Sequence, residues 1–470
     1  AIHGNKSQGQ RIRALEAFLA DVYDRGDIMR DGIVPKSLVT SSSHYHRQAH
    51  GIVPPNGVRI HVAGVDLVRD EVGKFHVLED NLRSPSGVSY VLENRRTLAH
   101  VVPEVFAGYR VSPVTEYPER LYRALAAAAP RDVHDPTVVV LTPGVYNSAH
   151  FEHAFLARRM GAELVEGRDL FCRGGFVYMR TTQGPQPVHV IYRRLDDEYL
   201  DPVQFRGDSV LGVPGLLNAA RAGAVTIANG VGNGVADDKA LYPYVPKIIE
   251  YYLGEKAILH NVATHDLTDP DVRAHVLERL DKMVIKPVDG SGGYGLVIGP
   301  KATEAELEEV AAAIIADPRS WIAQPVVTLS TSPTVGTGGA VQPRHLDLRP
   351  FAVNDGKKIW VLPGGLTRVA MNAGSLVVNS SQGGGSKDTW VLAGTGEEED
   401  GASLSAEAVL EARRLNRGLP TGGPITPRVS LPHTHEARMR QQEEQQQQAT
   451  DEVVPDATPV EAPQASEASC

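Results

Sequence analysis

Residues 283–295 read Met-Val-Ile-Lys-Pro-Val-Asp-Gly-Ser-Gly-Gly-Tyr-Gly, an apolar strand that ends in a lysine and a glycine-rich turn. A partly buried ammonium group such as that of Lys286 is costly unless it pairs with an anion. Glycines let backbone N–H groups approach phosphate oxygens closely. The stretch is no P-loop, because the Gly-Lys-Ser/Thr ending is missing. It therefore predicts either a phosphate site or a plain hairpin turn with an exposed lysine. The turn residues in question are Gly290, Ser291, Gly292, Gly293 and Gly295.

A second lysine strengthens the phosphate interpretation. Lys239 lies in Asp237-Asp-Lys-Ala-Leu-Tyr-Pro243, just after the glycine-rich stretch 229–234. Alone it would be an ordinary solvated helix residue. Two lysines from separate segments can hold the α- and β-phosphates as point charges. Gln324 ends a predicted strand before Pro325 and could face an adenine edge, or it could be an ordinary strand-end residue.

Three oxygen-bearing side chains precede the lysines and predict a magnesium site. Glu79 and Asn81 are two apart on a predicted strand and therefore share one face. Asp66 lies thirteen residues before Glu79, a separation that a hairpin can bring into register. Carboxylate and amide oxygens are ligands that Mg²⁺ prefers. The alternative is a solvated acidic hairpin end. Together with the lysines, the set predicts an enzyme that uses Mg-ATP.

Two arginines and two histidines complete the candidates. Arg349 and Arg368 lie on neighbouring predicted strands, where arginine forks suit phosphate or carboxylate, although a surface ion pair is the alternative. The glycine- and hydroxyl-rich segment 379–390 is either a second phosphate-facing loop or a plain flexible loop. His44 and His46 lack convincing third and fourth ligands, so they are predicted to be structural or substrate-facing rather than zinc ligands.

Composition excludes several classes of protein. The 470 residues carry a net charge of -10, which argues against general nucleic-acid binding. Cys172 and Cys470 are too few for a disulfide framework and favour a reducing compartment. No run is long enough to span a bilayer, and the N-terminus has no apolar signal region. These features predict a cytoplasmic protein that binds neither membrane nor nucleic acid.

The apolar pattern predicts an α/β fold. Strand-like and helical runs alternate between residues 137 and 228, which favours a parallel sheet covered by helices. A helix is predicted over 89–108, another from Asp238, and one over 304–316 with Thr303 as its N-cap. Beyond residue 320 an antiparallel sheet is predicted. Its strands are 321–329, 346–353, 358–363 and 365–371.

The chain resembles the circularly permuted ATP-grasp family, type 2, which is related to the synthetase domain of glutathionylspermidine synthase. The resemblance covers roughly residues 9–392 and depends on several stretches. In this chain the predicted metal residues precede the lysines, whereas in the common ATP-grasp order the lysines come first. The matching stretches are 61–69, 77–89, 238–243, 285–287 with its glycine turn, Gly364-Gly-Leu-Thr-Arg368 and Asn379-Ser-Ser-Gln-Gly-Gly-Gly-Ser-Lys-Asp-Thr-Trp390.

The resemblance implies a role for each candidate residue. Asp66, Glu79 and Asn81 would bind magnesium, Lys239 and Lys286 the ATP phosphates, and Gln324 the adenine side. Arg368 would contact the transferred phosphate, with Arg349 beside it. ATP would lie between two α+β sub-domains. The implied reaction activates a carboxylate as an acylphosphate, which an amine then attacks. The substrates of glutathionylspermidine synthase are not carried over, because its substrate-binding residues are not recognisable here.

The predicted organisation has three parts. Residues 1–50 form an N-terminal helical segment, shorter than family members usually carry. Residues 51–392 form the ATP-grasp domain, and 393–470 a linker, a short helix and a disordered acidic tail rich in Gln, Pro and Glu. Within the domain, metal-binding strands occupy 58–90, an α/β sub-domain 135–235 and ATP-binding segments 236–392. The alternatives are an ATP-binding regulatory or assembly protein without ligase activity, and an ATP-dependent phosphotransferase.

Overall fold

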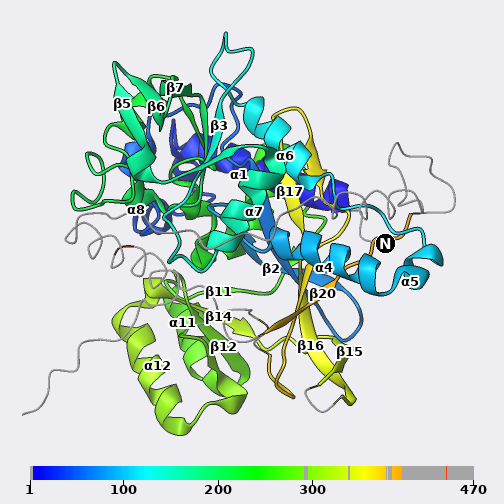
Figure 1. Ribbon diagram of the computed structural model, residues 1–470. Helices are drawn as coiled ribbons and strands as arrows, with labels where there is room; N and C mark the ends of the chain where they lie inside the picture. Colours follow the sequence, from blue (N-terminus) through cyan, green and yellow to red (C-terminus); the bar gives the residue numbers. More distant parts are fainter. Residues whose placement is uncertain are drawn as a thin grey trace, which may run out of the picture.

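The computed structural model describes residues 4–289, 295–336, 339–376, 378, 384–393 and 441 (Figure 1). The predicted short helix and acidic tail lie outside these residues, except for Gln441. Gln441 is buried, and its amide group bonds to the backbone of Asp208 and Val210. No described helix is long and apolar enough to cross a membrane.

A large mixed sheet forms the centre of the molecule. Its strands follow the order β10-β2-β1-β16-β19-β20, with β15 paired to β16, and β17 joining β1 to β18. The pairs are antiparallel except β10 with β2. The strands are β1 (Val62–Arg69), β2 (Phe75–Asn81), β10 (His260–Asn261), β15 (Thr331–Val335), β16 (Val341–Arg349), β17 (Phe351–Asn354), β18 (Ile359–Val361), β19 (Leu366–Val369) and β20 (Gly385–Asp388).

A parallel sheet packs beside the central sheet, as the alternating pattern predicts. Its order is β4-β3-β8-β9, and α6 and α7 pack on it. The strands are short and almost wholly apolar, as expected of buried parallel strands. The elements are β3 (Val138–Leu141), β4 (Glu163–Val165), β8 (Val190–Arg193), β9 (Thr226–Ala228), α6 (Tyr117–Ala126), α7 (His150–Met160), α8 (Asp197–Leu200) and α9 (Leu216–Arg221).

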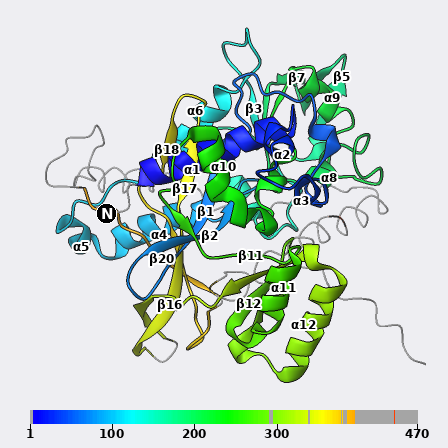
Figure 2. The same ribbon diagram turned by 180° about the vertical axis from the view of Figure 1, so that it is seen from behind.

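A small sub-domain lies at the bottom of the molecule in Figures 1 and 2, beside the end of the central sheet that carries β15 and β16; we call the rest of the molecule the body. Its antiparallel sheet has the order β11-β14-β12-β13 and packs with its helices around an apolar core of its own. Its elements are β11 (His265–Asp266), β12 (Met283–Pro287), β13 (Val297–Ile298), β14 (Trp321–Pro325), α11 (Pro270–Leu277) and α12 (Glu304–Ala316). Thr303 caps α12 in a reciprocal capping box with Glu306, which confirms the predicted N-cap.

The N-terminal helix belongs to the core of the body. α1 (Gly4–Val22) packs against α10 (Val245–Leu253) and β18, and its buried face includes Leu15 and Phe18. The helices α2 (Asp27–Arg30) and α3 (Lys36–Thr40) follow it. Helices therefore make up most of residues 4–40, and α1 is part of the main hydrophobic cluster.

Proline residues account for two differences from the predicted helices. The predicted helix over 89–108 is split into α4 (Val88–Val101) and α5 (Pro103–Ala107), because residue 102 precedes Pro103 and leaves the helical conformation. The helix predicted from Asp238 begins as the 3-10 helix η4 (Lys239–Tyr244), which contains Pro243. The predicted strand over 321–329 ends at Pro325, and it pairs with β11 and β12 rather than with the other strands of the predicted antiparallel sheet.

A three-stranded hairpin unit was not predicted. It comprises β5 (Leu170–Arg173), β6 (Phe176–Thr181) and β7 (Gly184–Val188). Gly174 and Gly175 form the first turn with positive φ angles of 61° and 84°. Two consecutive positive φ values are typical of the tight turns that suit hairpins.

Candidate active site

The register of β1 and β2 brings the three predicted metal ligands together. Asp66 pairs with Glu79, and Gly64 pairs with Asn81. Glu79 and Asn81 share one face of β2, and the side chain of Asp80 points to the other. Glu79 and Asn81 are half-buried, while Asp66 is fully buried. The hairpin predicted from the thirteen-residue spacing therefore has the expected register.

Both predicted arginines contact Asp66. Arg349 donates two hydrogen bonds to its carboxylate, and Arg368 donates another. Burial opposes ionisation of Asp66, but the two guanidinium groups hold its pKa well below the ordinary value. Burial, with repulsion from Asp66, raises the pKa of Glu79. The site is thus a tightly coupled set of charges.

Arg368 has a second carboxylate partner that sequence reasoning missed. β16 and β19 pair so that Asp347 lies opposite Arg368, and the two side chains form a bidentate ion pair. Both side chains are buried. A signal was present, because Asp347 stands two residues before Arg349 and so shares its face of the strand. Asp347 holds the Arg368 guanidinium beside Asp66.

The two predicted lysines come from the body and the small sub-domain. Lys239 begins η4 in the body, and its Nζ donates to the carbonyl of Val288, 3.2 Å away, just beyond β12. Lys286 lies on β12 and is half-buried. Burial lowers the pKa of Lys286 to about 8; Glu79 and Asp66 oppose that shift, and Lys239 adds to it. The structure thus brings both lysines near the carboxylates of β1 and β2.

The glycine turn is described only in part. Gly290, Ser291, Gly292 and Gly293 lie outside the described residues, whereas Gly295 lies in the turn before β13. The predicted loop 379–390 also lies partly outside them, at residues 379–383. Its later part forms β20, which pairs with β19 beside Arg368.

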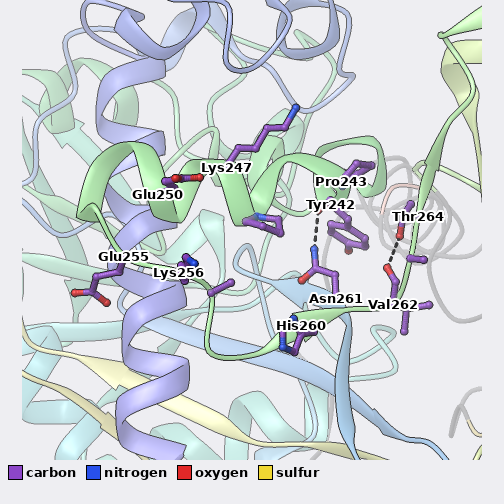
Figure 3. A pocket seen from close by; sticks show the side chains of 13 residues that line it. Tyr242, Pro243, Lys247, Glu250, Glu255, Lys256, His260, Asn261, Val262 and Thr264 are labelled. Carbon is purple, nitrogen blue, oxygen red and sulfur yellow. Dashed lines mark hydrogen bonds between the residues drawn. The ribbon is translucent and has the colours of Figure 1, made fainter.

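Gln324 lies on β14 next to the strand that carries Lys286. Its side chain is buried and donates to the Thr264 hydroxyl at 2.9 Å. Thr264 belongs to the segment that leads from the body into β11. A pocket of about 550 Å³ opens between this segment and α10 (Figure 3). The hydrogen bond therefore links the predicted adenine-side residue to the connection between the two sub-domains.

The sequence of the chain matches a known protein family. The family model described as "Circularly permuted ATP-grasp type 2" matches residues 5–370. The chain belongs to this ATP-grasp family. The match confirms the predicted family and the mixed α/β fold.

Relatives of this ATP-grasp chain occur in several bacteria. An uncharacterized protein of Mycobacterium tuberculosis is 65% identical over 384 residues, 82% of this chain and 70% of that protein. An uncharacterized protein of Synechocystis is 53% identical over 390 residues, 83% of this chain and 81% of that protein. A Frankia casuarinae protein named "Putative glutamate--cysteine ligase 2-2" is 47% identical over 384 residues, 81% of this chain but only 44% of that protein. The family and the name of the Frankia protein support an ATP-dependent ligase as the general class of this chain.

The donor set of the ATP-grasp site fits a hard cation. Glu79 and Asn81 offer a carboxylate and an amide oxygen on one face, beside Asp66. The raised pKa of Glu79 reflects burial and a neighbouring negative charge, both of which a divalent cation would offset. Asp66 already accepts hydrogen bonds from both arginines, so Glu79 and Asn81 carry the more accessible oxygens.

A buried arginine that sequence reasoning missed holds the strand of the candidate metal ligands. Arg11 of α1 donates to both Asp80 oxygens, at 2.7 and 2.6 Å, and to Asn261 Oδ1 at 2.7 Å. Asn261 in turn donates to the carbonyl of Tyr242 in η4 (Figure 3). Nothing in the local sequence of α1 indicates this partner, 69 residues away. Arg11 therefore joins β2 to the segment that carries Lys239.

The two histidines each lie near an aspartate of another segment. His44 Nε2 is 3.9 Å from Asp289 Oδ1, and His46 Nε2 is 3.7 Å from Asp197 Oδ2. Burial and nearby cations, Arg83 first among them, hold the pKa of His44 well below its usual value. His44 is thus next to the residue that precedes the glycine turn, and His46 is next to the first residue of α8.

Proposed function

We propose that this chain is an ATP- and magnesium-dependent carboxylate–amine ligase that works through an acylphosphate. One observation carries the proposal. Lys286 of the small sub-domain and Lys239 of the body lie near the same carboxylate and arginine cluster of β1, β2, β16 and β19. Cations from two sub-domains beside oxygen ligands for a hard cation suit a bound triphosphate.

The proposed reaction has two steps. A carboxylate oxygen of the first substrate attacks the γ-phosphorus of ATP, the bond to the β-phosphate oxygen breaks, and ADP leaves. An amine nitrogen then attacks the acyl carbon, phosphate leaves with the electrons of the C–O bond, and the nitrogen loses a proton to give the amide. Neither step requires a covalent bond to the protein, so positioning and charge neutralisation would supply the rate.

The lysines, the candidate metal ligands and the two arginines each have a part in this scheme. Lys239 and Lys286 would neutralise the α- and β-phosphates. Glu79, Asn81 and Asp66 would hold Mg²⁺, which offsets the charge of the phosphates when bound. Arg368, held by Asp347, would stabilise charge on the transferred phosphoryl group, with Arg349 beside it. The buried ion pairs fix these guanidinium groups before substrate arrives.

Hydroxylamine trapping tests the proposal. Hydroxylamine replaces the unknown amine and converts an acylphosphate into a stable hydroxamate. The protein is incubated with ATP, Mg²⁺, hydroxylamine and a library of carboxylic acids, and hydroxamate and ADP are measured. We expect equal amounts of both with at least one acid, and loss of both in Glu79→Gln. A phosphate ester in place of hydroxamate would indicate a phosphotransferase, and no ADP with any acid would contradict the proposal.

A further inference from the structure

A second charged cluster lies beside the candidate ATP site and has no part in the scheme above. Its centre is Arg83, two residues after Asn81 on the chain that leaves β2. Asp196, the residue before α8, lies near the guanidinium. Asp237, two residues before Lys239, also lies near it. Three segments of the body thus place charged groups around one arginine.

The guanidinium of Arg83 is only loosely tied to these carboxylates. Its Nε is 3.4 Å from Asp237 Oδ2, and its Nη1 is 3.7 Å from Asp196 Oδ1. Charge-assisted hydrogen bonds are shorter, about 2.7–2.9 Å. Asp237 instead accepts from the backbone N–H groups of Leu82 and Arg83, at 2.7 and 3.2 Å. The side chain of Arg83 is 24% exposed, and both of these carboxylates lie beyond the distance of a strong charge-assisted hydrogen bond.

The position of Arg83 is set by close packing. A Cβ on Gly234 would lie 2.7 Å from Arg83 Cδ and 2.8 Å from His44 Cβ, so only glycine fits there. His44 Nε2 lies 3.9 Å from Asp289 Oδ1. Asp289 follows Val288, whose carbonyl accepts a hydrogen bond from Lys239. Arg83 is therefore fixed close to both the metal-binding strand and the phosphate lysines.

We propose that Arg83, with Asp196 and Asp237, binds the carboxylate substrate, and that this substrate carries an amino group beside its carboxylate, as a free amino acid does. The inference rests on the proposed function and names its substrate class. A guanidinium fork matches a carboxylate in geometry. The two aspartates would repel a plain anion and attract a neighbouring ammonium group. Burial raises the pKa of Asp237 to about 7, and an ammonium group beside this carboxyl would favour its ionised form.

The test measures binding without turnover. The full chain, saturated with Mg²⁺ and the non-hydrolysable analogue AMP-PNP, is titrated calorimetrically with the standard amino acids and β-alanine. Each is compared with the acid that lacks the amino group and the amine that lacks the carboxylate. We expect at least one amino acid to bind at least tenfold more tightly than either analogue. Arg83→Gln and Asp196→Asn should each weaken that binding about tenfold, with AMP-PNP affinity unchanged.

A matched control and a second variant keep the result interpretable. Arg123→Gln removes an exposed arginine whose partner is Glu119 on α6, and should bind like the parent. Asp196 is 25% exposed, so Asp196→Asn should fold even if Arg83→Gln does not. The inference is overturned if no amino acid binds, if the acid without the amino group binds equally well, or if both variants bind like the parent.

The two proposals fail in different ways. Amino acid binding that depends on Arg83, without hydroxamate or ADP from any acid, would keep the subsite and contradict the ligase. Hydroxamate formed only from acids without an amino group would keep the ligase and overturn the subsite.

Discussion

His61 immediately precedes β1, and its ring is completely buried. Neither ring nitrogen has a hydrogen-bond partner among the residues that the structure describes. Burial lowers the pKa of His61 to about 4. The folded protein therefore holds this histidine neutral, while the unfolded chain takes up a proton below about pH 6.5. Stability should fall as the pH falls from 6.5 towards 4, because the unfolded state then binds more protons.

Replacing His61 with leucine removes this pH dependence. Between pH 7 and pH 5, the parent should lose about 2 kcal/mol more unfolding free energy than His61→Leu, a figure that follows from the two pKa values. Urea unfolding at both pH values measures the difference. An equal loss in parent and variant would show that His61 is protonated, or paired, in the folded protein.

Only part of the candidate site could be predicted from the sequence. The pairing of Asp66 with Glu79 follows from local spacing, so a hairpin pattern is enough to predict it. The contacts of Asp66 with Arg349 and Arg368 join residues 283 and 302 positions apart. No local pattern contains such contacts; they depend on how β1 and β16 meet in the central sheet. The same is true of Arg83 and its two aspartates.

Helix α1 contributes a buried ion pair to the element that carries the candidate metal ligands. Arg11 and Asp80 are both buried, and their contact is bidentate. Removing one partner from a buried pair leaves an uncompensated charge. We therefore expect Arg11→Met to destabilise the protein by about 3–5 kcal/mol, and Asp80→Asn in the same background to restore part of the loss. Urea unfolding of the two single variants and the double variant measures the coupling.

Arg13 on the same helix provides the matched control. Its side chain is 51% exposed and lies 3.9 Å from Glu255, so Arg13→Met should change stability by less than about 0.5 kcal/mol. If the Arg11 and Arg13 variants lose similar amounts of unfolding free energy, the effect comes from helix α1 in general rather than from the ion pair between Arg11 and Asp80 of β2.

Elements with strong local signals were predicted well. α12 begins and ends at the predicted residues, because Thr303 and Glu306 form a capping box. The hairpin unit β5–β7 was missed although Gly174-Gly175 gives a turn signal. Its strands alternate only loosely between apolar and polar residues, so the pattern alone did not indicate them. β20 was missed because a glycine-rich segment precedes it.

At the scale of the whole molecule, the order of the motifs indicated the fold. Metal-type residues before the lysines predict a permuted ATP-grasp arrangement, and the family match over residues 5–370 confirms it. The small sub-domain carries Lys286, and the body carries Lys239, Glu79 and Asn81. Two sub-domains were predicted. The residues that form each of them, and the way in which β12 and η4 approach one another, were not predicted, because both depend on long-range packing.

ATP affinity of Lys286→Met tests the central claim most directly. Methionine keeps most of the stem's packing and removes the charge. Without nucleotide, stability should stay the same or rise, because a partly buried ammonium is costly. Calorimetric titration with Mg-ATP should show affinity at least about tenfold weaker, the scale of a charge-assisted contact. The affinity for AMP, which lacks the β-phosphate, should fall less.

Lys282→Met is the control for this measurement. Lys282 is exposed and lies four residues earlier in the same sub-domain, so its variant should bind Mg-ATP like the parent. The account predicts that only Lys286→Met loses ATP affinity. If Lys286→Met binds ATP as tightly as the parent, the glycine segment is an ordinary hairpin turn and the proposed ATP site is wrong.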